Sequence, residues 1–148
     1  MHSIQATFTA LALCAVAASS ALAQSDFAQV AAKEPGAKVT ASGLVFRSLQ
    51  DGHGASPSAT DKVKVHYRGT FPDGKEFDSS YKRNQPIDFP LNAVIPCWTE
   101  GVQLMKVGGK AKLTCPPGIA YGARGAGGVI PPNATLQFEV ELIAIAGR

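Results

Sequence analysis

Apolar and polar residues alternate strictly along three stretches of the chain, residues 62–68, 109–115 and 135–143. In the first stretch, the alternation places Val63, Val65 and Tyr67 on one face and charged or polar side chains on the other. A period of two residues is typical of a β-strand with one face in the core and one face in water. Strands of this kind predict an antiparallel sheet.

Clusters of glycine, proline and aspartate separate these stretches, at residues 51–54, 72–74 and 108–109. They supply the backbone angles that tight turns need. One segment instead has helical spacing. Pro96 suits the first turn of a helix, and Trp98, Val102 and Met105 follow on one helical face before Gly108 marks its end. One short helix beside one antiparallel sheet predicts an α+β domain.

The first residues differ from the rest of the chain. Residues 11–18 form an apolar run that is too short to cross a bilayer as a permanent helix. Residues 21–23 have the A-x-A form of a signal-peptidase site, which predicts cleavage after Ala23. We therefore interpret residues 1–23 as a signal peptide for export. A buried N-terminal helix and a lipoprotein anchored through Cys14 are the alternatives.

Residues 24–41 are polar and rich in alanine, which predicts a short, partly helical N-terminal arm and linker. Residues 42–148 are enough for one domain, and an apolar share of 45% can supply its core. The formal charge of +3 is small and the basic residues are dispersed. This pattern argues against nucleic-acid binding.

The three histidines offer no familiar catalytic or metal site. His2 lies in the leader and His53 in a glycine-rich loop, while His66 falls on the outward face of its strand, where we expect it to be solvated. Because no second histidine is near any of them, neither a Ser-His-Asp triad nor a histidine zinc site is expected. We expect no metal and no cofactor.

Two cysteines remain after the predicted cleavage, Cys97 and Cys115. An even number of cysteines in an exported chain favours a disulfide. The alternative is a pair of buried thiols that pack as small apolar residues.

Aromatic residues lie on the predicted strands, at the helix start and in the turns, at positions Tyr67, Phe77, Phe89, Trp98, Tyr121 and Phe138. Alone, they predict only a packed core. The segments around them are VHYRG at 65–69, GKEFDSS at 74–80, VIPCWTEG at 94–101, AYG at 120–122 and IPPNATL at 130–136. In this order and spacing they resemble the motifs of FKBP-type peptidyl-prolyl cis/trans isomerases. The most similar members are bacterial periplasmic ones related to the macrophage infectivity potentiator.

The resemblance implies an α+β fold in which a five- to six-stranded antiparallel sheet wraps around one short helix. It implies a proline pocket whose catalytic residues are Tyr67, Phe77, Asp78, Tyr121 and Phe138. Substrate-binding roles are implied for Val94, Ile95, Trp98, Arg83, Ile87, Phe89 and Ile130. Trp98 would form the pocket floor and Arg83 would pair with Asp78. The chain departs from the eukaryotic pattern at Ile87, where an aromatic residue is common, at Cys97, which replaces a glycine, and at residues 125–128.

The same resemblance implies a peptidyl-prolyl isomerase that assists the folding of exported proteins in the periplasm. Its partners would be Xaa-Pro segments of folding polypeptides, and macrolides of the tacrolimus and rapamycin type are further candidate ligands. The alternative is a peptide-binding or chaperone module in which isomerase activity is incidental. Residues 24–41 are too few for a long dimerisation helix, so a monomer or weak dimer without a membrane span is expected.

Overall fold

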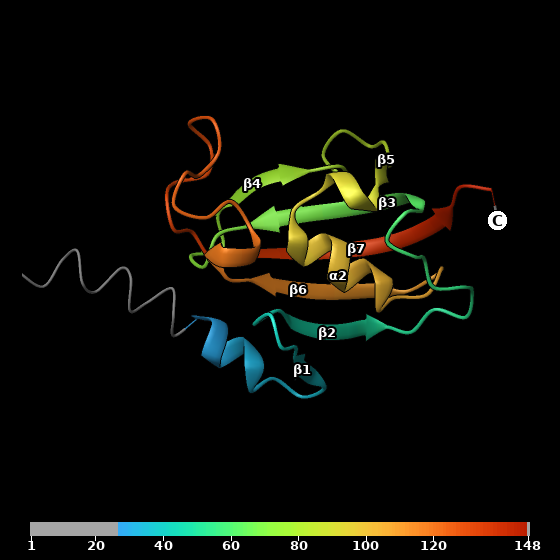
Figure 1. Ribbon diagram of the computed structural model, residues 1–148, viewed down its shortest axis with the longest axis horizontal. Helices are drawn as coiled ribbons and strands as arrows, with labels where there is room; N and C mark the ends of the chain where they lie inside the picture. The colour runs from blue at the N-terminus through green and yellow to red at the C-terminus, as the bar shows by residue number, and fades with distance from the viewer. Residues whose placement is uncertain (1–26, 148) are drawn as a thin grey trace, which may run out of the picture.

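The computed structural model describes residues 27–147, in which seven strands form one antiparallel sheet with a short helix lying across it (Figure 1). The elements are β1 (Ala37–Val39), β2 (Val45–Gln50), β3 (Lys62–Thr70), β4 (Glu76–Ser79), β5 (Ile87–Pro90), the 3-10 helix η1 (Leu91–Ala93), α2 (Pro96–Gln103), β6 (Lys110–Cys115), the 3-10 helix η2 (Pro117–Ile119) and β7 (Leu136–Ile145). The strand order is β1-β2-β6-β7-β3-β4, and β5 pairs with β3. The predicted α+β class is confirmed.

The sheet of the described residues has seven strands where the resemblance implied five or six. Part of the difference is β1, which pairs with β2 through Val39 and Val45 and lies within the segment assigned to the N-terminal arm. A strand of three residues is too short to show a period of two in the sequence. It forms a strand because it pairs with the edge of β2.

The core lies between α2 and the inner face of the sheet. Strand β3 contributes Val63, Val65 and Tyr67, all buried as their alternation predicts. From the helix side, Val102 is fully buried and Trp98 is 4% exposed. The helix ends at Gln103, earlier than the spacing predicts, so the buried Met105 lies beyond it in the turn that follows.

A glycine allows the helix to approach the sheet closely. A Cβ atom on Gly101 would lie 2.8 Å from Cδ2 of Leu113 on β6, inside the normal contact distance. A side chain here would push α2 away from β6 or displace Leu113 from the core. The glycine at position 101 thus allows the short distance between α2 and β6.

A disulfide joins the same two elements. Cys97 in the first turn of α2 is bonded to Cys115 at the end of β6, with Cα atoms 5.9 Å apart. Both residues are completely buried. The pairing that an even cysteine count favoured is therefore present, and the buried-thiol alternative is not. The bond ties the helix start, next to Trp98, to the sheet.

The N-terminal segment packs on β2 and β6 instead of hanging free. Residues 27–32 are helical, and Ala31 within them is 3% exposed. The carboxylate of Glu34 accepts hydrogen bonds from Arg47 at 2.5 Å and from Lys112 at 3.0 Å. The expected signal peptide, residues 1–23, lies outside the described residues. Within residues 27–147, no helix has the length and apolar character needed to span a bilayer.

Loss of the disulfide should lower the free energy of unfolding by about 3 kcal/mol, because the bond closes a loop of 18 residues in the unfolded chain. Urea unfolding of the oxidised protein, with and without a thiol reductant, measures this difference. A Cys97→Ala/Cys115→Ala variant is the control and should unfold at the same urea concentration in both conditions. Equal midpoints for the oxidised and reduced wild-type protein would contradict the prediction.

Candidate active site

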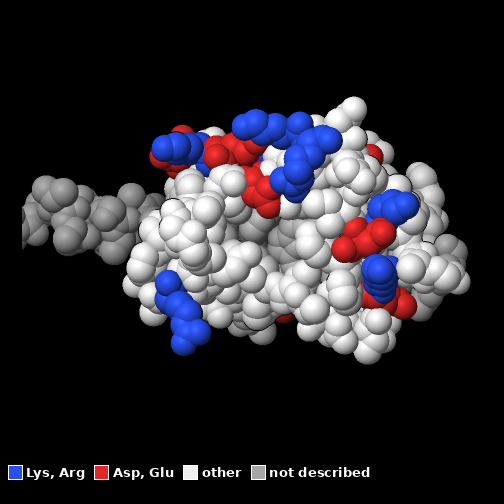
Figure 2. All heavy atoms as spheres, turned by 90° about the horizontal axis from the view of Figure 1, so that it is seen from above, with Lys and Arg blue, Asp and Glu red and all other residues white. Residues whose placement is uncertain are grey.

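A cavity of about 440 Å³ opens between the start of α2 and strands β3, β4, β5 and β7. Its lining is almost wholly apolar and aromatic, made of Tyr67, Phe77, Asp78, Phe89, Ala93, Val94, Ile95, Trp98, Tyr121 and Phe138. Figure 2 shows the molecule from the side of β4 and β5. There one group of charged side chains runs along the upper edge, and others lie at the right and at the lower left, around a broad uncharged area that is hollowed at its centre. The cavity therefore suits a small apolar group with a polar edge.

Trp98 is the residue around which the cavity is built. Three rings meet its indole edge to face, Tyr67 at 5.2 Å, Phe89 at 5.4 Å and Phe138 at 5.4 Å between centroids. Edge-to-face pairs are favourable and restrict ring rotation. The indole Nε1 is buried and has no hydrogen-bond partner among the described residues. The three ring contacts therefore hold the indole at the floor of the cavity in one orientation.

Gly69 lets two of the aromatic rings approach β3. It lies opposite Phe138 on β7 and opposite Asp78 on β4. A Cβ atom at this position would lie 2.5 Å from Cζ of Phe77 and 3.0 Å from Cε1 of Phe138. The rings of Phe77 and Phe138 meet edge to face at 5.6 Å. Gly69 thus belongs to the site without lining it, and its place in the VHYRG motif was the only sequence signal for it.

A polar network closes one wall of the cavity. The Tyr67 hydroxyl donates a short hydrogen bond to Oδ2 of Asp78. Arg83 donates from Nη1 to Oδ1 of Asp78 at 2.8 Å and from Nη2 to the Tyr67 hydroxyl at 3.2 Å. The backbone N–H of Ser79 adds a bond to Oδ1 at 2.9 Å. One carboxylate is therefore held at the cavity edge by three donor groups.

These contacts determine the protonation states of the network. Burial, with a further effect from Asp78, raises the pKa of Tyr67. For Asp78, burial by itself would raise the pKa, but the hydrogen bonds from Tyr67 and Arg83 and the charge of Arg83 outweigh it and the pKa is lowered. At neutral pH, Asp78 is therefore an anion and Tyr67 a neutral donor.

Two further hydrogen-bonding groups belong to residues that line the cavity and have no partner among the described residues. The backbone of Ile95 is extended and immediately precedes α2, so its N–H lies outside the helix. This N–H and the hydroxyl of Tyr121 make no hydrogen bond with other described residues. Tyr121 is 39% exposed at the rim. Both groups are available to carbonyl oxygens of a bound molecule.

Three of the expected substrate-binding residues lie away from the cavity lining. Arg83 acts on it only through Tyr67 and Asp78. Ile87 pairs with Val65 on β3. Ile130 is buried and forms an isolated β-bridge with Ala126. Conversely, Ala93 lines the cavity and was not expected, because a small residue in a 3-10 turn carries no chemical signal.

His66 is placed differently from the expectation of a solvated ring. It stacks on Tyr81, with centroids 4.6 Å apart and the planes 14° from parallel, and its Nδ1 is 2.9 Å from the Ser80 hydroxyl. The segment after β4 folds back over the outer face of the sheet and covers the ring, which the alternation along β3 cannot reveal. Within residues 27–147, no cluster of three or more His, Cys, Asp or Glu side chains suits a metal ion.

Comparison with known proteins identifies relatives of this chain. The family model of the FKBP-type peptidyl-prolyl cis-trans isomerase matches residues 54–143. The FKBP-type peptidyl-prolyl cis-trans isomerase FkpA of Aeromonas hydrophila is 59% identical over 114 residues, which are 77% of this chain and 42% of that protein. The 22 kDa FKBP-type isomerase of Escherichia coli is 54% identical over 114 residues, 77% of this chain and 55% of its own length.

Solved structures agree with the sequence comparison. The crystal structure of Escherichia coli FkpA superposes with a TM-score of 0.83 at 46% identity, covering 87% of this chain and 60% of that one. An isomerase from Pseudomonas syringae superposes with a TM-score of 0.79 at 43% identity, over 86% and 94% of the two chains. The chain spans about half the length of the two curated relatives described above. Family model, sequence identity and fold agree, and the chain belongs to the FKBP-type peptidyl-prolyl cis-trans isomerase family.

Proposed function

We propose that this protein catalyses the cis/trans isomerisation of Xaa-Pro peptide bonds in other polypeptides. The observation that carries the proposal is the cavity over Trp98, which combines an aromatic floor with an ionised Asp78 and free donors at its rim. Family membership supports the same activity. In this proposal the pyrrolidine ring of the substrate lies on the Trp98 indole, surrounded by Tyr67 and Phe138.

The reaction requires no proton transfer and no nucleophile. Rotation about the peptide bond meets a barrier of about 18–20 kcal/mol because it removes the amide resonance. The twisted amide is less dipolar than the planar amide, so transfer from water into an apolar cavity costs it less free energy. An apolar cavity therefore binds the transition state better than the ground state, which is the condition for catalysis.

The polar groups then have positioning roles. The N–H of Ile95 and the hydroxyl of Tyr121 would donate hydrogen bonds to carbonyl oxygens on either side of the proline. Asp78, Tyr67 and Phe77 would form the wall against which the substrate carbonyl rotates. Arg83 would position Asp78 without touching the substrate, because it reaches the cavity only through that carboxylate and the Tyr67 hydroxyl.

We propose further that the protein works on exported polypeptides in the periplasm. The A-x-A site at residues 21–23 and the Cys97–Cys115 disulfide support export, because disulfides persist mainly in oxidising compartments. Its partners are Xaa-Pro segments of folding chains, and macrolides of the tacrolimus and rapamycin type would compete for the same cavity. We expect a monomer or weak dimer.

Combining Asp78→Asn with Phe138→Leu should lower kcat/KM for a short Xaa-Pro peptide about a hundredfold, since each change removes about 1.4 kcal/mol of transition-state stabilisation. A protease-coupled isomerase assay measures this rate. The matched control combines Asp73→Asn with Phe27→Leu, two positions outside the cavity lining and the buried core, and should retain full activity. Unchanged isomerisation in the first variant would refute the proposed function.

Tyr121→Phe removes one hydroxyl and keeps the ring. We expect kcat/KM to fall about three- to tenfold, the worth of a single hydrogen bond of about 0.5–1.5 kcal/mol. The same assay measures it, with Tyr81→Phe as the control because that hydroxyl bonds to Glu141 on the outer face of the sheet. Equal activity of Tyr121→Phe and the wild type would exclude the hydroxyl from substrate binding.

The lowered pKa of Asp78 predicts how isomerase activity depends on pH in the acidic range. Its ionised form contributes to stability above the usual aspartate pKa of 3.8, and this contribution is lost only as the pH falls through the lowered value in the folded protein. Activity should therefore stay level down to about pH 4 and decline below it. Circular dichroism at each pH separates this decline from unfolding. A decline centred above pH 5 would show that Asp78 is not held as an anion.

A further inference from the structure

Two more hollows extend from the active-site cavity along the exposed side of α2. The middle hollow shares Val94 with the active-site cavity and follows Pro96, Thr99 and Gln103 along the helix. The end hollow, of about 420 Å³, shares Leu104 with the middle one and lies where α2 meets β1, β2 and β6. The three hollows therefore lie in a row along α2, each next to its neighbour, and we call this row the track.

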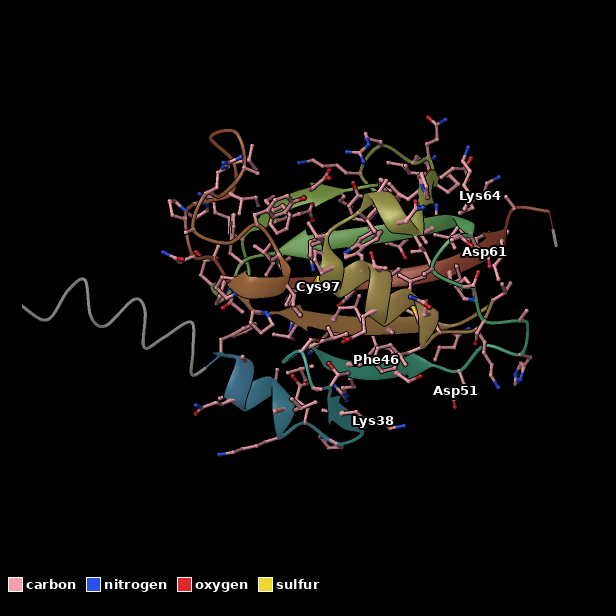
Figure 3. All side chains as sticks on the ribbon, viewed as in Figure 1. Lys38, Phe46, Asp51, Asp61, Lys64 and Cys97 are labelled. Atoms are coloured by element: carbon pink, nitrogen blue, oxygen red, sulfur yellow. A yellow bond between two sulfur atoms is a disulfide. The ribbon has the colours of Figure 1, made fainter. Side chains whose placement is uncertain are left out.

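The end hollow combines an apolar base with basic walls. Phe46 and Met105 are buried beneath it, and Leu104 is 52% exposed at its edge. Lys38, Lys106 and Lys110 line it. In Figure 3, Lys38 and Phe46 lie on neighbouring strands β1 and β2, with Asp51 at the far end of β2. Segments far apart in the sequence thus supply one basic hollow.

None of the three lysines forms an ion pair in the part of the chain that the structure describes. Lys110 lies opposite Glu141 on β7, whose carboxylate accepts a hydrogen bond from Tyr81. The one carboxylate in the lining, Asp51, accepts a hydrogen bond from the Ser48 hydroxyl at 2.7 Å. Its lysine and aspartate side chains give the lining three positive charges against one negative charge.

The walls are held by backbone hydrogen bonds. The N–H groups of His53 and Gly54 both donate to the Val107 carbonyl, at 3.2 and 3.1 Å. A Cβ atom on Gly52 would lie 2.3 Å from the Lys106 carbonyl oxygen, so only glycine permits this close approach of the two turns. The hollow is therefore formed before anything binds, which reduces the entropy lost on binding.

The middle hollow has a different charge from the end hollow. Its one carboxylate, Glu100, accepts hydrogen bonds from Thr40 at 2.6 Å and from Ser42 at 2.9 Å. The eight residues of α2 span about 12 Å, a distance that an extended polypeptide covers in about four residues. One client segment can therefore occupy the active-site cavity and the end hollow together.

From this geometry we propose that the end hollow binds acidic residues of a client polypeptide whose proline lies in the active-site cavity. The row of hollows that leads away from that cavity indicates a polypeptide occupant. Lys38, Lys106 and Lys110, which form no ion pair among the described residues, indicate carboxylates as the groups it carries. The track selects clients that carry Asp or Glu about four to seven residues from the proline. This inference rests on the proposed isomerase function and specifies its substrates.

The test uses five peptides with the same Xaa-Pro core. One is a tetrapeptide that fills only the cavity, and four are longer peptides with either Glu-Glu or Gln-Gln four to seven residues from the proline, on one side of it or the other. Fluorescence anisotropy gives Kd and the coupled assay gives kcat/KM. At low salt we expect one Glu peptide to bind about tenfold more tightly than its Gln counterpart, a difference that high salt removes.

The variant K38E/K106E/K110E should abolish the preference for Glu and leave kcat/KM for the tetrapeptide unchanged. The matched control K33E/K62E/K64E has the same net charge, and its positions lie outside the hollow lining. Figure 3 places Lys64 at the opposite side of the sheet from Lys38. The control should keep the preference. The single variant K38E changes only an exposed residue of an edge strand and should reduce the preference about threefold.

Equal binding of Glu and Gln peptides by the wild type overturns the inference, as does an equal effect of the two triple variants. A parallel loss of tetrapeptide turnover in K38E/K106E/K110E also overturns it, because the lysines would then serve the fold or the cavity. Lysine-dependent binding to anionic phosphatidylglycerol vesicles without any peptide preference would assign the hollow to a membrane surface instead. Absence of tetrapeptide turnover in the wild type would refute the proposed isomerase, while the peptide preference would still be measured by anisotropy.

Discussion

The packing of α2 against β6 is the constraint on which the rest of the structure depends. Gly101 lets the helix backbone approach Leu113, and the disulfide from Cys97 to Cys115 ties its first turn to the sheet. Trp98 is the next residue along that turn, so its depth in the core follows from the same contacts. If the helix moved outward, the three rings around the indole would lose their edge-to-face contacts and the cavity would lose its floor.

A second consequence of this packing is the division of the site into an apolar floor and a polar wall. The floor comes from α2, β3 and β7, whose side chains interlock in the core. The wall comes from Asp78 on the short edge strand β4, where solvent and Arg83 can reach the carboxylate. An anion at the edge of an apolar cavity requires such donors, because an unpaired buried charge is costly. The arrangement favours a neutral, weakly dipolar group inside and hydrogen bonds at the rim.

How much of the site follows from the sequence differs from residue to residue. The alternation along β3 placed Tyr67 in the core, and the FKBP-type motifs indicated Phe77, Asp78 and Trp98, which do line one cavity. Gly69 was not singled out, because its contribution is the absence of a side chain where two rings come close. Ala93 was not singled out, because a methyl group carries no chemical signal in the sequence. The stacking of His66 on Tyr81 was missed for a different reason, since it depends on how the chain folds back after β4.

The sequence by itself determined the α+β class, the turns and the set of aromatic residues, because periodicity and turn chemistry are local properties of the chain. Only the tertiary structure decided which of them meet. Strand β1 exists because β2 offers an edge, and the track beside α2 exists because Lys38, Lys106 and Lys110 come from separate elements to one place. Contacts between residues far apart along the chain depend on the packing of the whole domain, and no local pattern records them.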